Sequence, residues 1–404
     1  MTGAPPVLRS FHVLAKPTGA RCNLSCSYCF FLKKEALYPG SRFRMGDDVL
    51  DAYIRQTIEG QTGDEATISW QGGEPTLMGL GFFRRAVEIA ERYRPPGMRI
   101  QHTIQTNGTR ITAEWARFFR EHDVLVGLSM DGPQRLHDIY RLDRRGQGTF
   151  ARVWEGLRHL QAEGARVNIL ATVHAGNAAH ALEVYRFFRD EAQVPFLQFI
   201  PIVERDNATG DTVGSALTPR SITAAEYGEF LVEIFDEWVS RDVGSMHVQI
   251  FEVTLGTHIG AASTLCIFSP TCGGSVALEH TGDLYSCDHF VEEPHRLGNI
   301  LQTPIADLVD SPRQRQFGRS KLLSLPRQCR ECDVLALCYG GCPKDRTAVT
   351  ADGEPGLNHL CAGYRRFFRH VDLAMRQMAS LRRCGRAPAE IVFLQPEDDS
   401  APLV

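Results

Sequence analysis

The chain has 404 residues, 43% hydrophobic and 23% charged, with a formal net charge of -4, which is typical of a globular protein with one large and one smaller domain. The slightly acidic balance argues against a generic nucleic-acid-binding or membrane-surface protein. No apolar run approaches the roughly 20 residues that span a bilayer, and no signal peptide is recognisable, so we expect a cytoplasmic protein.

Short apolar runs alternate with amphipathic stretches from residue 10 to about residue 240. Runs of this length suit strands that are buried on both faces of a sheet, and the stretches between them have helical periodicity. Six strand-then-helix units predict an α/β fold with a parallel sheet, interpreted as a partial (β/α)6 TIM-like barrel because a full barrel needs eight units. The predicted strands are residues 10–16, 66–70, 100–105, 124–130, 167–173 and 196–202.

Polar and glycine-rich segments lie at the ends of the first four predicted strands. A three-cysteine segment, 22–29, follows the first strand, 71–75 follows the second, 106–109 follows the third and 129–133 ends the fourth. In parallel α/β folds the chemistry gathers at the carboxyl ends of the strands. We therefore expect one active site there.

The twelve cysteines are unevenly distributed. Three lie near the start, none lie between Cys29 and Cys266, and the rest lie in the last third of the chain. In a reducing compartment, clustered cysteines indicate metal binding or redox chemistry more often than disulfides. The predicted domains are the barrel at 1–240, a connecting segment at 241–265, a cysteine-rich domain at 266–372, and a C-terminal helix and tail at 373–404.

Cys22, Cys26 and Cys29 have the spacing C-x3-C-x2-C. Three thiolates can hold three irons of a four-iron cube and leave the fourth iron open for a substrate or cofactor. By spacing alone, a structural zinc site completed by a distant His or Cys is an alternative. Tyr28 before the last cysteine, and the sequence QGGEP at 71–75, favour the cluster. In these features the chain resembles the radical S-adenosylmethionine (SAM) superfamily.

In that superfamily the open iron binds SAM, which is cleaved to a 5′-deoxyadenosyl radical. The resemblance implies that Gly73 offers backbone groups to the methionine amine of SAM and that Tyr28 contacts its adenine. It also implies that Ser129 and Arg141 hold the SAM carboxylate, while Leu197 lines the adenine pocket. Taken singly, Arg141 is also compatible with a solvated basic run.

The eight cysteines from Cys266 to Cys361 are enough for two fully ligated four-iron clusters, and two zinc sites would use the same number. Their arrangement is similar to the SPASM domain, an auxiliary-cluster module of radical SAM peptide-modifying enzymes. Cys384 falls outside the pattern. The ligands implied by the resemblance are Cys266, Cys272, Cys287 and Cys342 for the first auxiliary cluster, and Cys329, Cys332, Cys338 and Cys361 for the second.

Motifs over nearly the whole chain, to about residue 370, resemble the anaerobic sulfatase-maturating enzymes; they include KPTGARCNLSCSYCFF, QGGEPTL, VGLSMDGP and GDLYSCD. Such enzymes oxidise a Cys or Ser of a sulfatase to formylglycine. The resemblance implies three 4Fe-4S clusters and SAM as cofactors. The implied partners are a sulfatase polypeptide with a Cys/Ser-x-Pro-x-Arg motif and an electron donor such as flavodoxin or ferredoxin.

The reaction implied by the resemblance begins when the deoxyadenosyl radical abstracts a Cβ hydrogen from the target residue. Asp288, directly after Cys287, is then placed to take the thiol or hydroxyl proton as a general base. A carboxylate beside an anionic cluster should have a raised proton affinity. The remaining electron leaves through the auxiliary clusters.

Two positions bear on the substrate. Relatives commonly carry Tyr two positions after the last cysteine of the SAM motif, where this chain has Phe31, and the missing hydroxyl makes an altered peptide substrate an alternative. Gln71 is a candidate contact to the peptide, and a structural role suits it equally.

Two other functions stay open. The first is a SPASM maturase that makes a thioether, a carbon–carbon crosslink or an epimer in a ribosomal peptide. The second is a non-catalytic zinc-binding interaction protein, which would contain zinc and no iron and would leave the SAM-motif segments without a role.

Overall fold

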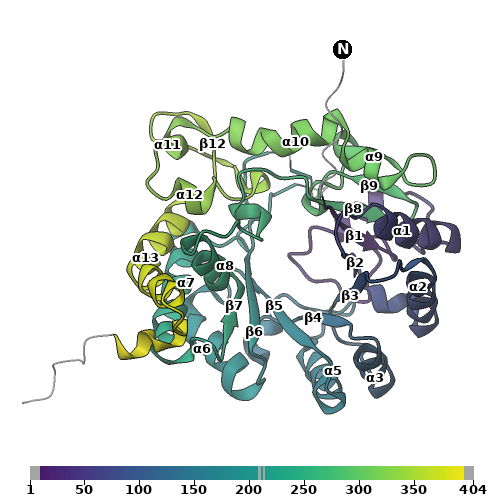
Figure 1. Cartoon of the computed structure of the whole chain (residues 1–404), viewed down its shortest axis with the longest axis horizontal. Helices are drawn as coiled ribbons and strands as arrows, with labels where there is room; N and C mark the ends of the chain where they lie inside the picture. Colours follow the sequence, from purple (N-terminus) through teal and green to yellow (C-terminus); the bar gives the residue numbers. More distant parts are fainter. Residues whose placement is uncertain (1–9, 208–210, 213, 395–404) are drawn as a thin grey trace, which may run out of the picture.

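The computed structural model describes residues 10–207, 211–212 and 214–394 (Figure 1). Its strands are β1 (His12–Lys16), β2 (Glu65–Trp70), β3 (Arg99–Thr106), β4 (Leu125–Ser129), β5 (Val167–Val173), β6 (Phe196–Pro201), β7 (His247–Val248), β8 (Ser275–Glu279), β9 (Asp283–Tyr285) and β10 (Arg296–Asn299). They form one sheet in the order β10-β9-β8-β1-β2-β3-β4-β5-β6-β7. Neighbours from β8 through β1 to β7 are parallel, while β9 is antiparallel to both β8 and β10.

The six predicted strands are confirmed as β1 to β6, and the partial barrel is confirmed with them. The sheet continues beyond them, because β7 adds two residues beside β6 and β8 pairs with β1 over five residues. Figure 1 shows β8, late in the sequence, lying beside β1, with β9 on the other side of β8. The predicted boundary at residue 266 therefore separates two parts that share one sheet.

The structure describes only part of the last predicted domain and does not describe the outermost residues of the first. The segment 373–404 was expected to be a separate helix and tail, but its first residues belong to a single helix that begins at Cys361. Residues 1–9 and 395–404, at the outer limits of the predicted domains, lie outside the described residues.

Helices cover the outer face of the sheet (Figure 1). The helix α5 (Phe150–Glu163) ends at Gly164, whose φ of +71° favours glycine. At the start of α7 (Ala224–Glu237), Thr223 and Glu226 form a reciprocal capping box. No helix among the described residues is both long and apolar enough to cross a membrane. The barrel helices are α1 (Asp47–Glu59), α2 (Leu80–Tyr93), α3 (Ala113–Glu121), α4 (Gln134–His137), α5 (Phe150–Glu163), α6 (Ala181–Arg186), α7 (Ala224–Glu237) and α8 (Gln249–His258).

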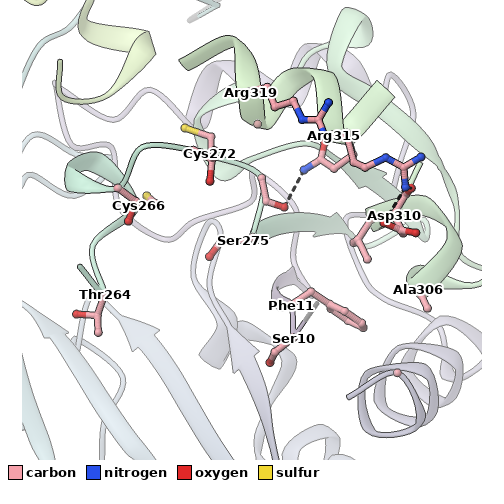
Figure 2. Close-up of a pocket in the computed structure, with 18 residues that line it drawn as sticks. Ser10, Phe11, Thr264, Cys266, Cys272, Ser275, Ala306, Asp310, Arg315 and Arg319 are labelled. Atoms are coloured by element: carbon pink, nitrogen blue, oxygen red, sulfur yellow. Dashed lines mark hydrogen bonds and ion pairs between the residues drawn. The ribbon is translucent and has the colours of Figure 1, made fainter. Parts of the chain in front are cut away.

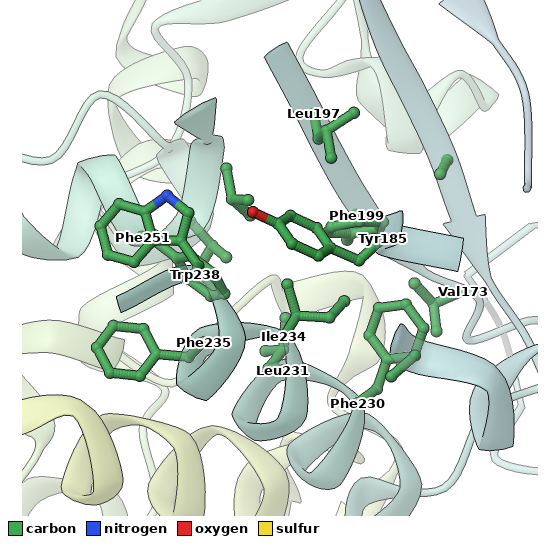
Figure 3. Close-up of a cluster of buried hydrophobic side chains, with 14 of the residues drawn as sticks. Val173, Tyr185, Leu197, Phe199, Phe230, Leu231, Ile234, Phe235, Trp238 and Phe251 are labelled. Carbon is green, nitrogen blue, oxygen red and sulfur yellow. The ribbon is translucent and has the colours of Figure 1, made fainter. Parts of the chain in front are cut away.

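One of the hydrophobic cores lies between the sheet and these helices. On β6, Leu197 and Phe199 point away from the barrel interior into a cluster that includes Phe230 and Trp238, as Figure 3 shows. Phe199 and Phe230 meet edge to face with ring centroids 5.3 Å apart. Because side chains alternate along a strand, Gln198 and Ile200 point to the opposite face of the sheet, toward the barrel interior.

The cysteine-rich region returns to the barrel through its last helix. Its elements are α9 (Ile305–Val309), α10 (Pro312–Leu323), α11 (Arg327–Arg330), α12 (Leu335–Cys338), β11 (Ala348–Val349), β12 (Pro355–Leu357) and α13 (Cys361–Arg383). The helix α13 packs against α7 at two glycines: a Cβ on Gly228 would lie 2.8 Å from the Gly363 Cα, and one on Gly363 would overlap the Ala224 carbonyl. Only glycine allows the two backbones to approach this closely.

Candidate active site

The three-cysteine loop is held by the loops that follow β2 and β3, and Glu74 is the centre of this arrangement. Its fully buried carboxylate accepts hydrogen bonds from the Thr76 amide (3.0 Å) and hydroxyl (2.6 Å), the Thr106 hydroxyl (2.7 Å) and the Asn107 amide (2.8 Å). The Glu74 amide donates to the Arg21 carbonyl at 3.0 Å. Burial raises the pKa of Glu74, while these hydrogen bonds oppose the rise.

Gly73 lies directly against the three-cysteine loop. A Cβ at this position would overlap the Arg21 carbonyl, so the contact requires glycine. The Gly73 amide donates to the Gly19 carbonyl at 2.8 Å. An amine donates hydrogen bonds, so the Gly73 carbonyl is the backbone group that suits the predicted contact with SAM.

The three cysteines of the loop fit an iron site. The Cys22 sulfur accepts from the Leu24 amide (3.3 Å) and lies 3.6 Å from the Asn107 side-chain amide, two contacts that suit a thiolate. Burial raises the pKa of Cys22 and Cys26 to about 12, so metal binding must supply the energy that removes their protons. All twelve cysteines of the chain, each within the described residues, are free thiols.

Tyr28 and Arg141 meet at a buried carboxylate that the sequence analysis did not single out. The Tyr28 hydroxyl donates to Asp131 at 2.6 Å. Arg141 forms an ion pair with the same carboxylate, in which Nη2 donates to one oxygen at 3.0 Å and Nε lies 2.9 Å from the other. Burial alone would raise the pKa of Asp131, but the Arg141 guanidinium holds it well below its usual range. Arg141 is therefore a buried, oriented cation rather than part of a solvated run.

The other predicted SAM and substrate residues differ in their placement. Ser129, at the end of β4, accepts a hydrogen bond from the Gln105 side chain at 2.9 Å on the inner face of the barrel. Gln71 follows β2, where its amide donates to the Ala15 carbonyl at 2.8 Å. The Leu197 side chain lies in the outer hydrophobic core (Figure 3), and the predicted contact of this residue with the adenine stays a prediction.

Asp288 is paired with Lys16, a buried residue that lies 272 positions earlier in the sequence. Lys16, the last residue of β1, donates to Asp288, and its ammonium lies 4.1 Å from the centre of the Phe31 ring. Burial would raise the pKa of Asp288, but the Lys16 charge holds it below its usual value. The protein groups therefore do not raise the proton affinity of Asp288 as was expected, because that expectation took no account of Lys16.

The structure brings together the two predicted sets of auxiliary ligands. Cys329, Cys332, Cys338 and Cys361 line one cavity of about 230 Å³. Cys266 and Cys272 line another, of about 370 Å³, which Figure 2 shows beside Arg315 and Arg319. Burial raises the pKa of Cys287, and the nearby charges of Cys342 and Cys266 raise it further, so these thiols are neighbours. The donors of both sets suit iron, because four-iron clusters are held by cysteine thiolates. Among the described residues, no group of three or more side chains is already arranged to hold a metal ion.

Four residues of the site were not predicted from the sequence. Three of them lie in loop segments that were predicted, where their acidic or amide side chains were the available indication: Glu74, Asn107 and Asp131. Lys16 is the first residue of the motif KPTGARCNLSCSYCFF, but nothing in that motif indicates that it pairs with a carboxylate of the cysteine-rich region.

Comparison with known proteins follows the same division of the chain. Residues 17–188 match the Radical SAM superfamily, and residues 266–333 match an iron-sulfur cluster-binding domain, SPASM. A serine-type anaerobic sulfatase-maturating enzyme of Bacteroides thetaiotaomicron is 42% identical over 96% of this chain and 95% of its own length. The chain belongs to the anaerobic sulfatase-maturating enzymes. A cysteine-type member of this family from Clostridium perfringens is 32% identical over 89% of this chain and 95% of its own length.

Solved structures agree with this membership. The structure described as native anSMEcpe with bound AdoMet matches with a TM-score of 0.83 at 30% identity, covering 91% of this chain and 99% of its own. Streptococcus suis SuiB bound to its precursor peptide SuiA matches with a TM-score of 0.62 at 16% identity, a likeness that shows the fold alone. As an anaerobic sulfatase-maturating enzyme, the protein is a radical SAM oxidoreductase with 4Fe-4S clusters and SAM as cofactors, and a count of three clusters fits its domains. The non-catalytic zinc-protein alternative is wrong.

Proposed function

We propose that this enzyme oxidises a serine or cysteine side chain of a sulfatase polypeptide to formylglycine. The observation that carries the proposal is the contact between Asp288 and Lys16. It places a carboxylate of the cysteine-rich region at the carboxyl end of β1, the strand that leads into the three-cysteine loop. The serine-type and cysteine-type relatives support the same reaction.

The residues divide the work as follows. When bound and reduced, SAM supplies the abstraction of a Cβ hydrogen from the target residue. Asp288 accepts the proton of the target hydroxyl or thiol, and Lys16 fixes the orientation of that carboxylate. Loss of one hydrogen atom, one proton and one electron oxidises the side chain by two electrons in total. A serine becomes the aldehyde directly, whereas a cysteine becomes a thioaldehyde, which water hydrolyses to the aldehyde with release of hydrogen sulfide. The eight C-terminal cysteines would hold the clusters that accept the electron.

SAM would be held by groups on three loops. The Gly73 carbonyl would receive its amine, while Ser129 and Arg141 would bind its carboxylate; Arg141 still has N–H groups beyond those in the ion pair with Asp131. Tyr28 would contact the adenine. A small one-electron carrier such as flavodoxin or ferredoxin would supply the reducing electron.

We propose serine as the preferred target. Three serine-type relatives are 42%, 37% and 37% identical to this chain, whereas the cysteine-type relatives are 32%, 32% and 30% identical. The buried Phe31 ring lies against the Lys16 ammonium, and it places no hydroxyl beside Lys16 and Asp288. Its effect on peptide selection is tested by Phe31→Tyr.

The test is mass spectrometry of an anaerobic reaction. Reconstituted enzyme, SAM and a reductant are given a Ser-x-Pro-x-Arg peptide and, separately, its Cys counterpart. We expect both peptides to yield an aldehyde that a hydrazine reagent captures, with the serine peptide converted faster. If SAM is cleaved while both peptides return unaltered, the radical chemistry stands and the sulfatase substrate is wrong, and a ribosomal peptide precursor becomes the next substrate to test.

A further inference from the structure

Arg346 lies between the two sets of auxiliary cysteines. Its guanidinium is within electrostatic reach of Cys272 and Cys342 of the first set and of Cys329 and Cys338 of the second. Within the described part of the chain, no carboxylate forms an ion pair with it. A half-buried cation without a carboxylate is costly unless other anions compensate it, and thiolates are the anions present here.

The contacts of Arg346 place it at the link between the two sets. It donates to the carbonyls of Tyr339 and Gly340, both at 3.4 Å, and to the Ser324 hydroxyl at 2.9 Å. Residues 339–341 form a left-handed turn, with φ values of +45°, +71° and +60°. This turn joins Cys338, of the second set, directly to Cys342, of the first. The guanidinium therefore hydrogen-bonds to the turn at residues 339–341, which connects the two sets of cysteines.

Lys321 provides a contrast. Its buried ammonium donates to the carbonyls of Cys266 (2.6 Å), Ile267 (2.8 Å) and Ser269, and the thiols that act on its charge are Cys266, Cys272 and Cys342, all of the first set. Lys321 thus neutralises one site, whereas Arg346 faces both.

We propose that Arg346 is a positioning residue shared by the two auxiliary clusters, whose charge raises the reduction potential of both. Reduction adds a negative charge to a cluster, so a fixed cation nearby stabilises the reduced form. A cation placed between the clusters raises both reduction potentials together, which makes electron acceptance by each cluster more favourable. This inference rests on the proposed assignment of the eight cysteines.

The test is a potentiometric titration followed by electron paramagnetic resonance. The full-length chain carries alanine at Cys22, Cys26 and Cys29, so that only the auxiliary clusters are observed. In this background we compare Arg346→Gln, Arg346→Lys and Lys321→Met with Arg166→Gln, which removes an exposed arginine of the barrel. Iron content is measured for every variant.

Arg346→Gln is expected to shift both midpoint potentials to more negative values than in Arg166→Gln, and Lys321→Met to shift only one. Arg346→Lys keeps the charge, so both midpoint potentials should stay close to those of Arg166→Gln. Unshifted potentials in a fully loaded Arg346→Gln protein, or a shift of one cluster alone, would overturn the inference. If Arg346→Gln loses iron, Arg346→Lys decides: retained iron and potentials support the role of the charge, and lost iron overturns it. A background chain that holds fewer than two clusters would overturn the assignment of the cysteines, and this inference with it.

Discussion

Lys16 and Asp288 lie 272 residues apart in the sequence and meet in an ion pair whose lysine is buried. The lysine contacts one carboxylate oxygen, Oδ1, which leaves Oδ2 to meet a proton of the substrate. A base that is fixed in this way is positioned before the substrate arrives, so less reorganisation is needed when the proton moves.

Replacing Asp288 with Asn is expected to separate the two halves of the reaction. Cleavage of SAM should continue, while formylglycine formation falls by about 10²- to 10⁴-fold, the usual contribution of a general base. Both products are measured by liquid chromatography and mass spectrometry. Asp123→Asn, which alters an exposed carboxylate paired with Arg166 on the barrel, should leave both yields unchanged. Formylglycine formation at the native rate in the Asp288 variant would remove this residue as the base.

The buried pair of Asp131 and Arg141 has a structural role that can be measured separately. Asp131→Asn leaves the Arg141 charge buried without a partner, which typically costs about 3–5 kcal/mol. The midpoint of thermal unfolding should fall clearly, whereas Asp123→Asn, at the exposed pair with Arg166, should change it little. An equal effect of both substitutions would contradict the importance of burial.

The pH dependence of that pair follows from the depressed pKa of Asp131. Its stabilisation is fully present above the unfolded-state pKa of about 3.9 and is lost as the pH falls through the lower folded-state pKa. The difference between the native chain and Asp131→Asn should therefore be constant from neutral pH down to about pH 5.

At the scale of loops, the placement of the SAM motif depends on the close approach of Gly73 to the three-cysteine loop. Gly73→Ala would force the two loops apart, because its Cβ overlaps the Arg21 carbonyl. A displacement of about 1 Å costs about 10²-fold in rate, and we expect a loss of this size in SAM cleavage. The control is Gly63→Ala, where the added Cβ meets nothing within 4 Å. Normal cleavage by the Gly73 variant would show that the loop can adjust.

The sequence predicted the elements whose evidence is local. The strands β1 to β6 are apolar runs between helical stretches, and each was found. In contrast, β7 has only two residues, too few for a pattern, and β8 pairs with a strand at the other end of the chain. Pairing over such a distance leaves no trace in local periodicity.

The same limit applies to the site. Loops at strand ends were identified because their glycines and polar residues stand out against apolar strands. The direction of the Leu197 side chain could not be predicted, because it depends on which face of β6 meets α7, and a strand that is apolar on both faces does not reveal this. Lys16 was missed because only the folded chain brings it to Asp288.

At the scale of the molecule, the cysteine-rich region is attached to the barrel at both of its ends. Its first strand, β8, pairs with β1, and its last helix, α13, packs on α7. Cys361, a predicted ligand of the second auxiliary cluster, is the first residue of α13. The packing of that helix on the barrel therefore also fixes the position of one ligand.

Cys361→Ser is expected to remove the second auxiliary cluster and about four irons per chain. Iron and sulfide analysis of the reconstituted protein measures the loss. Cys384→Ser changes an exposed cysteine one residue beyond the same helix and should leave the iron content at the native value. Equal iron in both variants would exclude Cys361 as a ligand.

The pairing of β8 with β1 restricts how such a protein can be reassembled from parts. A barrel cut before β8 would expose the β1 edge, and open edges recruit other chains into aggregates. A cysteine-rich region borrowed from a relative would also have to keep the register of Val13 opposite Val276. A slip of one residue turns every side chain of the borrowed strand to the opposite face. The cysteine-rich region therefore has to be transferred together with β1, and chimaeras are best joined at loops that leave the β1–β8 pair intact.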